Sequence, residues 1–224
     1  MTEGQPVRAL IPAALVPVLL ATASPPAAAG EEVGAEEILA GLTSCRQVSH
    51  GKYRADDGAP ARIPVCDTKG AVFFEADMDI DCDGQVSRQC SRKTDPLFQA
   101  ATAFQQSDGK PLDSARLPYV VVPGASRIWK HEESGIKGGA VAAVIHGGRL
   151  TYAVVGDTGP TDIIGEASYA AAKSLGIDPD PVRGGTGSGV TYVLFKNSRV
   201  TPIESRDDAV SRGRELAERF VRGG

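Results

Sequence analysis

Aromatic residues make up only 5% of this 224-residue chain, and there is no excess of positive charge. The 24 basic residues stand against 28 acidic ones, which gives a formal net charge of −4. This balance excludes a generally basic nucleic-acid-binding protein, because such proteins bind phosphates through clustered lysine and arginine. Turn-forming residues, by contrast, are plentiful, with 26 glycines and 15 prolines. The composition is typical of a turn-rich globular protein with many β-strands rather than of a helical bundle.

The chain also lacks a hydrophobic run long enough to cross a bilayer. Its most apolar stretch, residues 9–22, is shorter than the roughly 20 residues that a membrane span requires, and Pro12 and Pro17 interrupt it. The small alanines at positions 27–29 are typical of a signal cleavage site. We therefore expect residues 1–29 to be a secretory signal peptide, and the mature protein to be extracellular and free of the membrane.

The four cysteines lack the spacing of a metal site. No C-x-x-C pair occurs and no two histidines lie at ligand spacing, which excludes a zinc site of the usual kind. An even number of cysteines in an exported chain is typical of disulfides. Of the three possible pairings we favour the sequential one, Cys45 with Cys66 and Cys82 with Cys90, because it closes two local loops.

Short apolar runs separated by turn signals predict a mainly β fold (α+β) with a few short helices. Strands are expected over residues 71–74, 119–122, 140–145, 150–155 and 190–195, the third and fourth forming a hairpin. Helices are expected over residues 31–44, with Ile38, Leu39 and Leu42 facing inward, and over 96–106, 166–175 and 206–221, the third ending at Gly176. We expect a single catalytic domain over residues 30–224, a β-barrel decorated by short helices.

Two carboxylates follow the strand expected at 150–155. Asp157 lies in the motif G-D-T-G-P, where the glycines predict a sharp turn that a ligand can approach closely. Glu166 follows at the start of an expected helix. Glycoside hydrolysis uses such a pair, one protonated to assist the leaving oxygen and one ionised to activate water or attack. An Asp in a turn and a Glu in a first helical turn are also common for purely structural reasons.

The surroundings favour Glu166 as the general acid and Asp157 as the general base. The apolar neighbours Ile163 and Ile164 are expected to raise the pKa of Glu166. Turn N–H groups and the Thr158 hydroxyl are expected to keep Asp157 ionised. The dipole of the expected helix opposes this assignment, since it stabilises an ionised Glu166, so the reverse roles stay open.

Four aspartates alternate upstream, at positions 77, 79, 81 and 83. In an extended strand this spacing places them on one face. The pattern Asp79-x-Asp81-x-Asp83 resembles the opening of a calcium loop, but its twelfth position is Cys90 instead of a bidentate glutamate, so no metal or other cofactor is expected. A polycationic substrate would be attracted to these carboxylates, and Asp81 and Asp83 are the favoured contacts. A solvated acidic loop is the alternative.

Two further features carry weaker signals. Trp129, the only tryptophan, is a candidate for stacking on a sugar ring, although a core position fits it equally well. The glycine-rich segment 184–189 lacks the ending of a phosphate-binding loop and is expected to be a mobile loop beside the cleft.

Several separated blocks of this sequence together resemble the chitosanases of glycoside hydrolase family 75. The blocks are DMDIDCDG (77–84), YVVVPG (119–124), AVVGDTGPTDIIGEASYAAAKSLGI (153–177) and VTYVLF (190–195), within a resemblance that covers roughly residues 45–200. It implies a secreted endo-chitosanase that cleaves β-1,4 bonds between glucosamine units with inversion. It also implies that Asp157 and Glu166 are the essential acids, and that the barrel is of the double-psi type.

The resemblance does not extend to the ends of the chain, and it leaves two alternative functions open. Residues 31–44 and 202–224 resemble nothing specific. The alternatives are a related glycosidase acting on a neutral or acetylated polysaccharide, and a non-catalytic secreted barrel that binds polysaccharide. For the leading hypothesis we expect a monomer whose partner is chitosan, with Asp81, Asp83, Thr158 and Trp129 in contact with the polymer.

Overall fold

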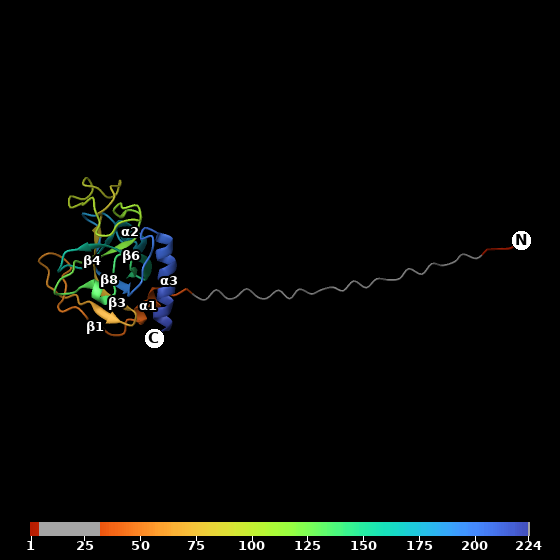
Figure 1. The fold of residues 1–224 in the computed structure, drawn as a ribbon, viewed down its shortest axis with the longest axis horizontal. Coiled ribbons are helices and arrows are strands. Elements are labelled where there is room, and N and C mark those ends of the chain that lie inside the picture. Colours follow the sequence, from red (N-terminus) through yellow and green to blue (C-terminus); the bar gives the residue numbers. More distant parts are fainter. Residues whose placement is uncertain (5–31, 224) are drawn as a thin grey trace. The chain divides into compact units, whose positions relative to one another are not determined.

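Eight strands form one sheet in the computed structural model, which describes residues 1–4 and 32–223 (Figure 1). The strands are β1 (Arg46–Gln47), β2 (Cys66–Thr68), β3 (Ala71–Asp81), β4 (Tyr119–Pro123), β5 (Val141–His146), β6 (Arg149–Gly159), β7 (Glu166–Ser168) and β8 (Thr186–Phe195). The helices are α1 (Ala35–Ala40), α2 (Tyr169–Leu175), α3 (Arg206–Arg222) and the 3-10 turn η1 (His131–Ser134).

Six of these strands close into a barrel. Their order is β3-β7-β4-β6-β5-β8, and the pairing of β8 back onto β3 closes the ring. Closure leaves the six strands without a free edge, so their backbone groups are satisfied within the sheet. The expected single-domain barrel with short helices is confirmed, and the double-psi connections stay a prediction.

Both faces of the barrel wall are buried, which explains the continuous apolar runs. Along β4, Val120 and Val122 point into the barrel, while Tyr119 and Val121 belong to a second cluster outside it. Helix α3 covers part of that outer face, and Figure 1 shows it lying along one side of the barrel. Period-two alternation thus divides the buried apolar residues of the strands between two cores.

The C-terminal segment follows its sequence signals closely. Helix α3 begins after Ser205, whose side chain accepts a hydrogen bond from the backbone N–H of Asp208. Val210, Leu216 and Phe220 pack against the outer cluster, as a helix with one apolar stripe should. The expected helix over 206–221 is confirmed, and this segment completes the outer core.

The hairpin is also confirmed. Strands β5 and β6 pair from Val141 opposite Val154 to His146 opposite Arg149. Gly147 and Gly148 form the turn with φ angles of 55° and 76°, the left-handed pair that a two-residue hairpin turn requires.

Two helix predictions are wrong here, one in part and one in whole, and a third, over residues 166–175, is wrong at its start because α2 begins only at Tyr169. In the first, helix α1 spans only six residues, so Ile38 is buried whereas Leu39 is 39% exposed. In the second, residues 96–106 form no helix, because backbone N–H groups there donate to carboxylates instead of to helix carbonyls. Leu97 donates to Asp95, Gln99 to Asp83 and Ala103 to Asp157.

The prediction of a mobile glycine-rich loop over 184–189 is also wrong. Strand β8 already begins at Thr186, which lies opposite Met78 of β3. Gly185 approaches β3 so closely that an added Cβ would lie 2.4 Å from the Met78 carbonyl oxygen. The glycines here permit close backbone packing and an irregular pairing.

The predicted signal peptide lies outside the described residues, apart from residues 1–4. Within residues 1–4 and 32–223, no helix has the length and apolar character that crossing a membrane requires.

Candidate active site

One extra residue in β6 decides where Asp157 points. In the parallel pairing with β4, Val155 lies opposite Val120, but Asp157 lies opposite Val121, so Gly156 has no partner and forms a bulge. Val155 faces the barrel interior, and the bulge turns Asp157 to the outer face beside Val121. The expected turn at 156–160 is therefore wrong: the strand continues to Gly159, and a bulge replaces the turn.

Replacing Gly156 with alanine is expected to lower the free energy of unfolding by about 1–3 kcal/mol. An added Cβ would lie 2.6 Å from Tyr119 Cβ and 2.7 Å from Leu112 Cδ1, both in fully buried side chains. Urea denaturation measures the effect. Gly187→Ala is the matched control, because nothing lies within 4 Å of its added Cβ. Equal stability of the two variants would contradict the packing argument.

Glu166 lies on a short strand, not on a helix as expected. It begins β7, which pairs with β3 on one side, placing Glu166 opposite Asp79, and with β4 on the other, placing it opposite Val121. Helix α2 starts only at Tyr169, capped by the Ser168 side chain, which accepts from the N–H of Ala171 at 3.2 Å. The predicted end of this helix at Gly176, in the left-handed conformation, is confirmed. The helix-dipole objection to a protonated Glu166 therefore does not apply.

The two carboxylates flank the same residue on the same face of the sheet. Asp157 and Glu166 both pair with Val121, one from each neighbouring strand. Because adjacent strands lie about 4.8 Å apart, their Cα atoms are separated by roughly 10 Å across the sheet. The Glu166 carboxyl bends back over Gly159, where an added Cβ would lie 2.5 Å from Oε2. Glycine at this position leaves room for the acid.

The two carboxyl groups lie in different surroundings. Oδ1 of Asp157 accepts hydrogen bonds from the N–H groups of Ala103 at 2.8 Å and Thr158 at 2.7 Å. Burial raises the pKa of Asp157, and these two bonds oppose the shift because they stabilise the ionised form. Burial and then the nearby charges of Asp79 and Asp157 raise the pKa of Glu166 to about 7. The higher pKa favours Glu166 as the member that carries a proton, while the two N–H donors favour the ionised form of Asp157.

Both acids line one pocket of about 220 Å³. Its other acidic residues are Asp81, Asp83 and Asp95, and Thr158 also lines it. One oxygen from each of Asp81, Asp83 and Asp157 lies within 4.8 Å of the others. Burial raises the pKa of Asp81 well above its usual range and that of Asp83 to about 6. The pocket therefore concentrates carboxyl groups that a cation would stabilise.

The structure separates Trp129 from this group. Its side chain is 4% exposed and belongs to the interior core, and its Nε1–H donates to Ser134 Oγ at 2.8 Å. The pocket that it lines also contains His50 and Glu133, but none of the five pocket acids. Asp95 is the pocket acid that sequence reasoning missed, since it lies in an irregular segment with no recognisable motif.

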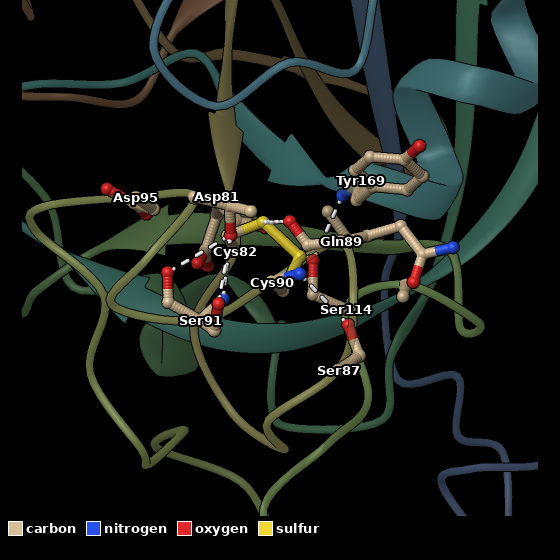
Figure 2. The surroundings of a disulfide bond; sticks show 12 residues. Asp81, Cys82, Ser87, Gln89, Cys90, Ser91, Asp95, Ser114 and Tyr169 are labelled. Carbon is tan, nitrogen blue, oxygen red and sulfur yellow. Dashed lines mark hydrogen bonds between the residues drawn. A yellow bond between two sulfur atoms is a disulfide. The ribbon is translucent and has the colours of Figure 1, made fainter.

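A disulfide closes the loop that supplies Asp83 and precedes Asp95. Cys82 follows β3 directly and bonds to Cys90, as Figure 2 shows beside Asp81 and the ring of Tyr169. Ser114 connects the same region to α2: its Oγ donates to the Asp81 carbonyl and accepts from the N–H of Tyr169. Cys45 bonds to Cys66, so both disulfides have the favoured sequential pairing.

The alternating aspartates divide between two places. Asp81 lies at the pocket with Asp83, whereas Asp77 and Asp79 lie beside Asp56. Asp77, Asp79 and Asp81 belong to the extended strand β3, so the segment does not wrap around an ion as a calcium loop does.

Comparison with known proteins identifies the family of the chain. The family model described as fungal chitosanase of glycosyl hydrolase group 75 matches residues 78–219, which include β3 from Met78 onward and both candidate acids. The chain belongs to this family. Endo-chitosanase C of Aspergillus oryzae is 31% identical over 160 residues, which cover 67% of this chain and 40% of that protein.

Two further relatives carry related names. Endo-chitosanase B of Aspergillus oryzae strain ATCC 42149 / RIB 40 is 30% identical over 155 residues, covering 62% of this chain and 64% of the relative. An endo-chitosanase of Aspergillus fumigatus is 34% identical over 140 residues, covering 58% of each chain. The family 75 chain thus spans between 40% and 64% of the length of these relatives.

Proposed function

We propose that this chain is a secreted endo-chitosanase that hydrolyses β-1,4 bonds between glucosamine units with inversion. One observation carries the proposal: Asp157 and Glu166 flank Val121 on one face of the sheet and line one pocket. Membership of family 75 and relatives named endo-chitosanase support the same activity. In this proposal residues 30–224 form a single catalytic domain, and the enzyme acts as a monomer outside the cell.

Glu166 is the general acid and Asp157 the general base. The desolvated Glu166 keeps its proton at pH values below about 7 and transfers it to the leaving glycosidic oxygen. Asp157, held by two N–H donors, takes a proton from the attacking water. Inverting enzymes separate the two carboxyl groups by about 6.5–9.5 Å to leave room for that water, and a spacing of two strands suits this range.

Asp81 and Asp83 select the amine-bearing sugar. Desolvation and mutual repulsion disfavour several ionised carboxylates in one small pocket. An ammonium group entering among them relieves that repulsion, whereas an acetamido group carries no charge and cannot do so. Thr158, which follows the base, offers its hydroxyl to the polymer.

The surface around the pocket suits an internal stretch of polymer. Pro181 lines both this pocket and a neighbouring hollow of about 660 Å³. Ala103, whose N–H donates a hydrogen bond to Asp157, lines another hollow of about 390 Å³. Hollows next to the acids offer a long polymer further contacts, which favours cleavage within a chain over removal of its end units.

The deciding experiment compares chitosan, chitin and cellulose as substrates of the purified protein. We expect new reducing ends from chitosan only, with a fast fall in viscosity, and an α-anomer as the first product by proton NMR. Activity on chitin or cellulose alone would identify the neutral-polymer glycosidase, and binding without hydrolysis would identify the non-catalytic barrel. A β-anomer as first product would contradict inversion while leaving the activity intact.

A further inference from the structure

A second carboxylate cluster lies outside the pocket, at the other end of the acidic run. It consists of Asp56, from a loop, and Asp77 and Asp79, from β3. One oxygen from each lies within 4.8 Å of the other two. None of the three lines the pocket that holds Asp157 and Glu166.

The buried member of this cluster has an unsatisfied oxygen. Asp77 is only 5% exposed, and its Oδ1 has no hydrogen-bond partner. Among the residues that the structure describes, no salt bridge involves Asp56, Asp77 or Asp79, although Arg54 nearby pairs with Asp162. A buried carboxylate beside two others with no compensating cation is costly, because burial and repulsion both disfavour its charge. A bound cation removes both costs.

The donor set defines the class of cation. All three side chains offer carboxylate oxygens, which are the ligands preferred by hard cations, and the cluster includes no cysteine or histidine. Asp56 and Asp79 are exposed, so water can supply the remaining ligands of an ion that takes six to eight oxygens. We infer that Asp56, Asp77 and Asp79 form a calcium-binding site.

The position of the cluster gives such an ion a structural role. The N–H of Arg54 donates to the carbonyl of Asp162 at 3.0 Å, and the N–H of Ile164 donates back to the carbonyl of Arg54 at 3.0 Å. The N–H of Asp79 donates to the carbonyl of Gly165 at 2.8 Å. An ion held by Asp56 and Asp79 therefore ties the loop, β3 and the 160–165 connection together. That connection joins the strand of Asp157 to the strand of Glu166.

Calcium binding to the chelator-treated full chain tests the inference without any substrate. Isothermal titration calorimetry is expected to show one calcium site, and differential scanning calorimetry is expected to show a higher melting temperature with calcium than with EDTA, because a ligand of the folded state stabilises it. Mg²⁺ is expected to bind more weakly, since it demands an octahedral site and loses water reluctantly.

Two variants test whether these aspartates bind the calcium ion, and a third variant serves as the control. Asp77→Asn and Asp56→Asn are each expected to weaken calcium binding at least about 10-fold, because each removes a charged ligand. Asp57→Asn removes a charge from the same exposed loop outside the cluster and is expected to bind calcium as the wild type does. Absence of a calcium-dependent melting shift in the wild type would overturn the inference. So would unchanged affinity in Asp77→Asn, whose folding in EDTA is checked by the same melting curve.

Discussion

Glu166→Gln is expected to lower kcat on chitosan by about 100- to 10,000-fold, the range that a general acid contributes. The amide keeps the size of the side chain, which lies over Gly159, but cannot donate a proton to the leaving oxygen. Reducing-end assays at saturating chitosan measure the loss. Glu75→Gln, on the exposed side of β3, is the matched control and is expected to retain full activity.

The same variant should not be destabilised at neutral pH. The pKa of Glu166 rises from 4.5 in the reference state to about 7 in the folded protein, so between these values the folded state binds more protons than the unfolded one. In the wild type, the stability that protonated Glu166 contributes is therefore lost as pH rises through about 7, because the buried carboxyl then ionises beside Asp79. A neutral glutamine avoids that loss, so the melting temperature of Glu166→Gln at pH 8 should equal or exceed that of the wild type.

The proton on Glu166 also sets the pH dependence of activity. Activity of the wild type is expected to fall as pH rises through about 7, because the general acid then loses its proton. The residual activity of Glu166→Gln should lack this alkaline decline. An unchanged alkaline limb in the variant would remove Glu166 from the role of acid.

Asp157→Asn is expected to cause the second large loss, again about 100- to 10,000-fold in kcat. The asparagine carbonyl can still accept from the N–H groups of Ala103 and Thr158, so the local geometry is preserved. It cannot take a proton from water. Asp207→Asn, at the exposed start of α3, is the matched control, and circular dichroism confirms the fold of both variants.

An activated substrate distinguishes the two roles. A nitrophenyl glycoside of a glucosamine oligomer has a leaving group that departs without protonation. Glu166→Gln should therefore recover much of the wild-type rate on this substrate, whereas Asp157→Asn should stay inactive because water still needs its base. The opposite pattern would assign the acid to Asp157, and full activity of either variant on chitosan would exclude that residue from the mechanism.

Local patterns in the sequence were sufficient to predict much of the fold. The β5–β6 hairpin follows from two apolar runs around Gly147 and Gly148, and α3 from one apolar stripe. The sequential disulfides and the proximity of Asp157 to Glu166 along the chain were also visible. Each of these features depends on residues within about 20 positions of one another, where spacing predicts geometry directly.

Only the tertiary structure decided where the acids face. Whether Gly156 forms a turn or a bulge depends on β4, more than 30 positions earlier in the chain. Likewise Glu166 is in a strand because β3 and β4 lie on either side of it, which overrides the helical preference of the alanines that follow. The sequence by itself was sufficient to name the candidate carboxylates and to predict the strands that lie next to them. Pairing between distant strands determined which share a pocket, because a register shift of one residue moves a side chain to the opposite face of the sheet.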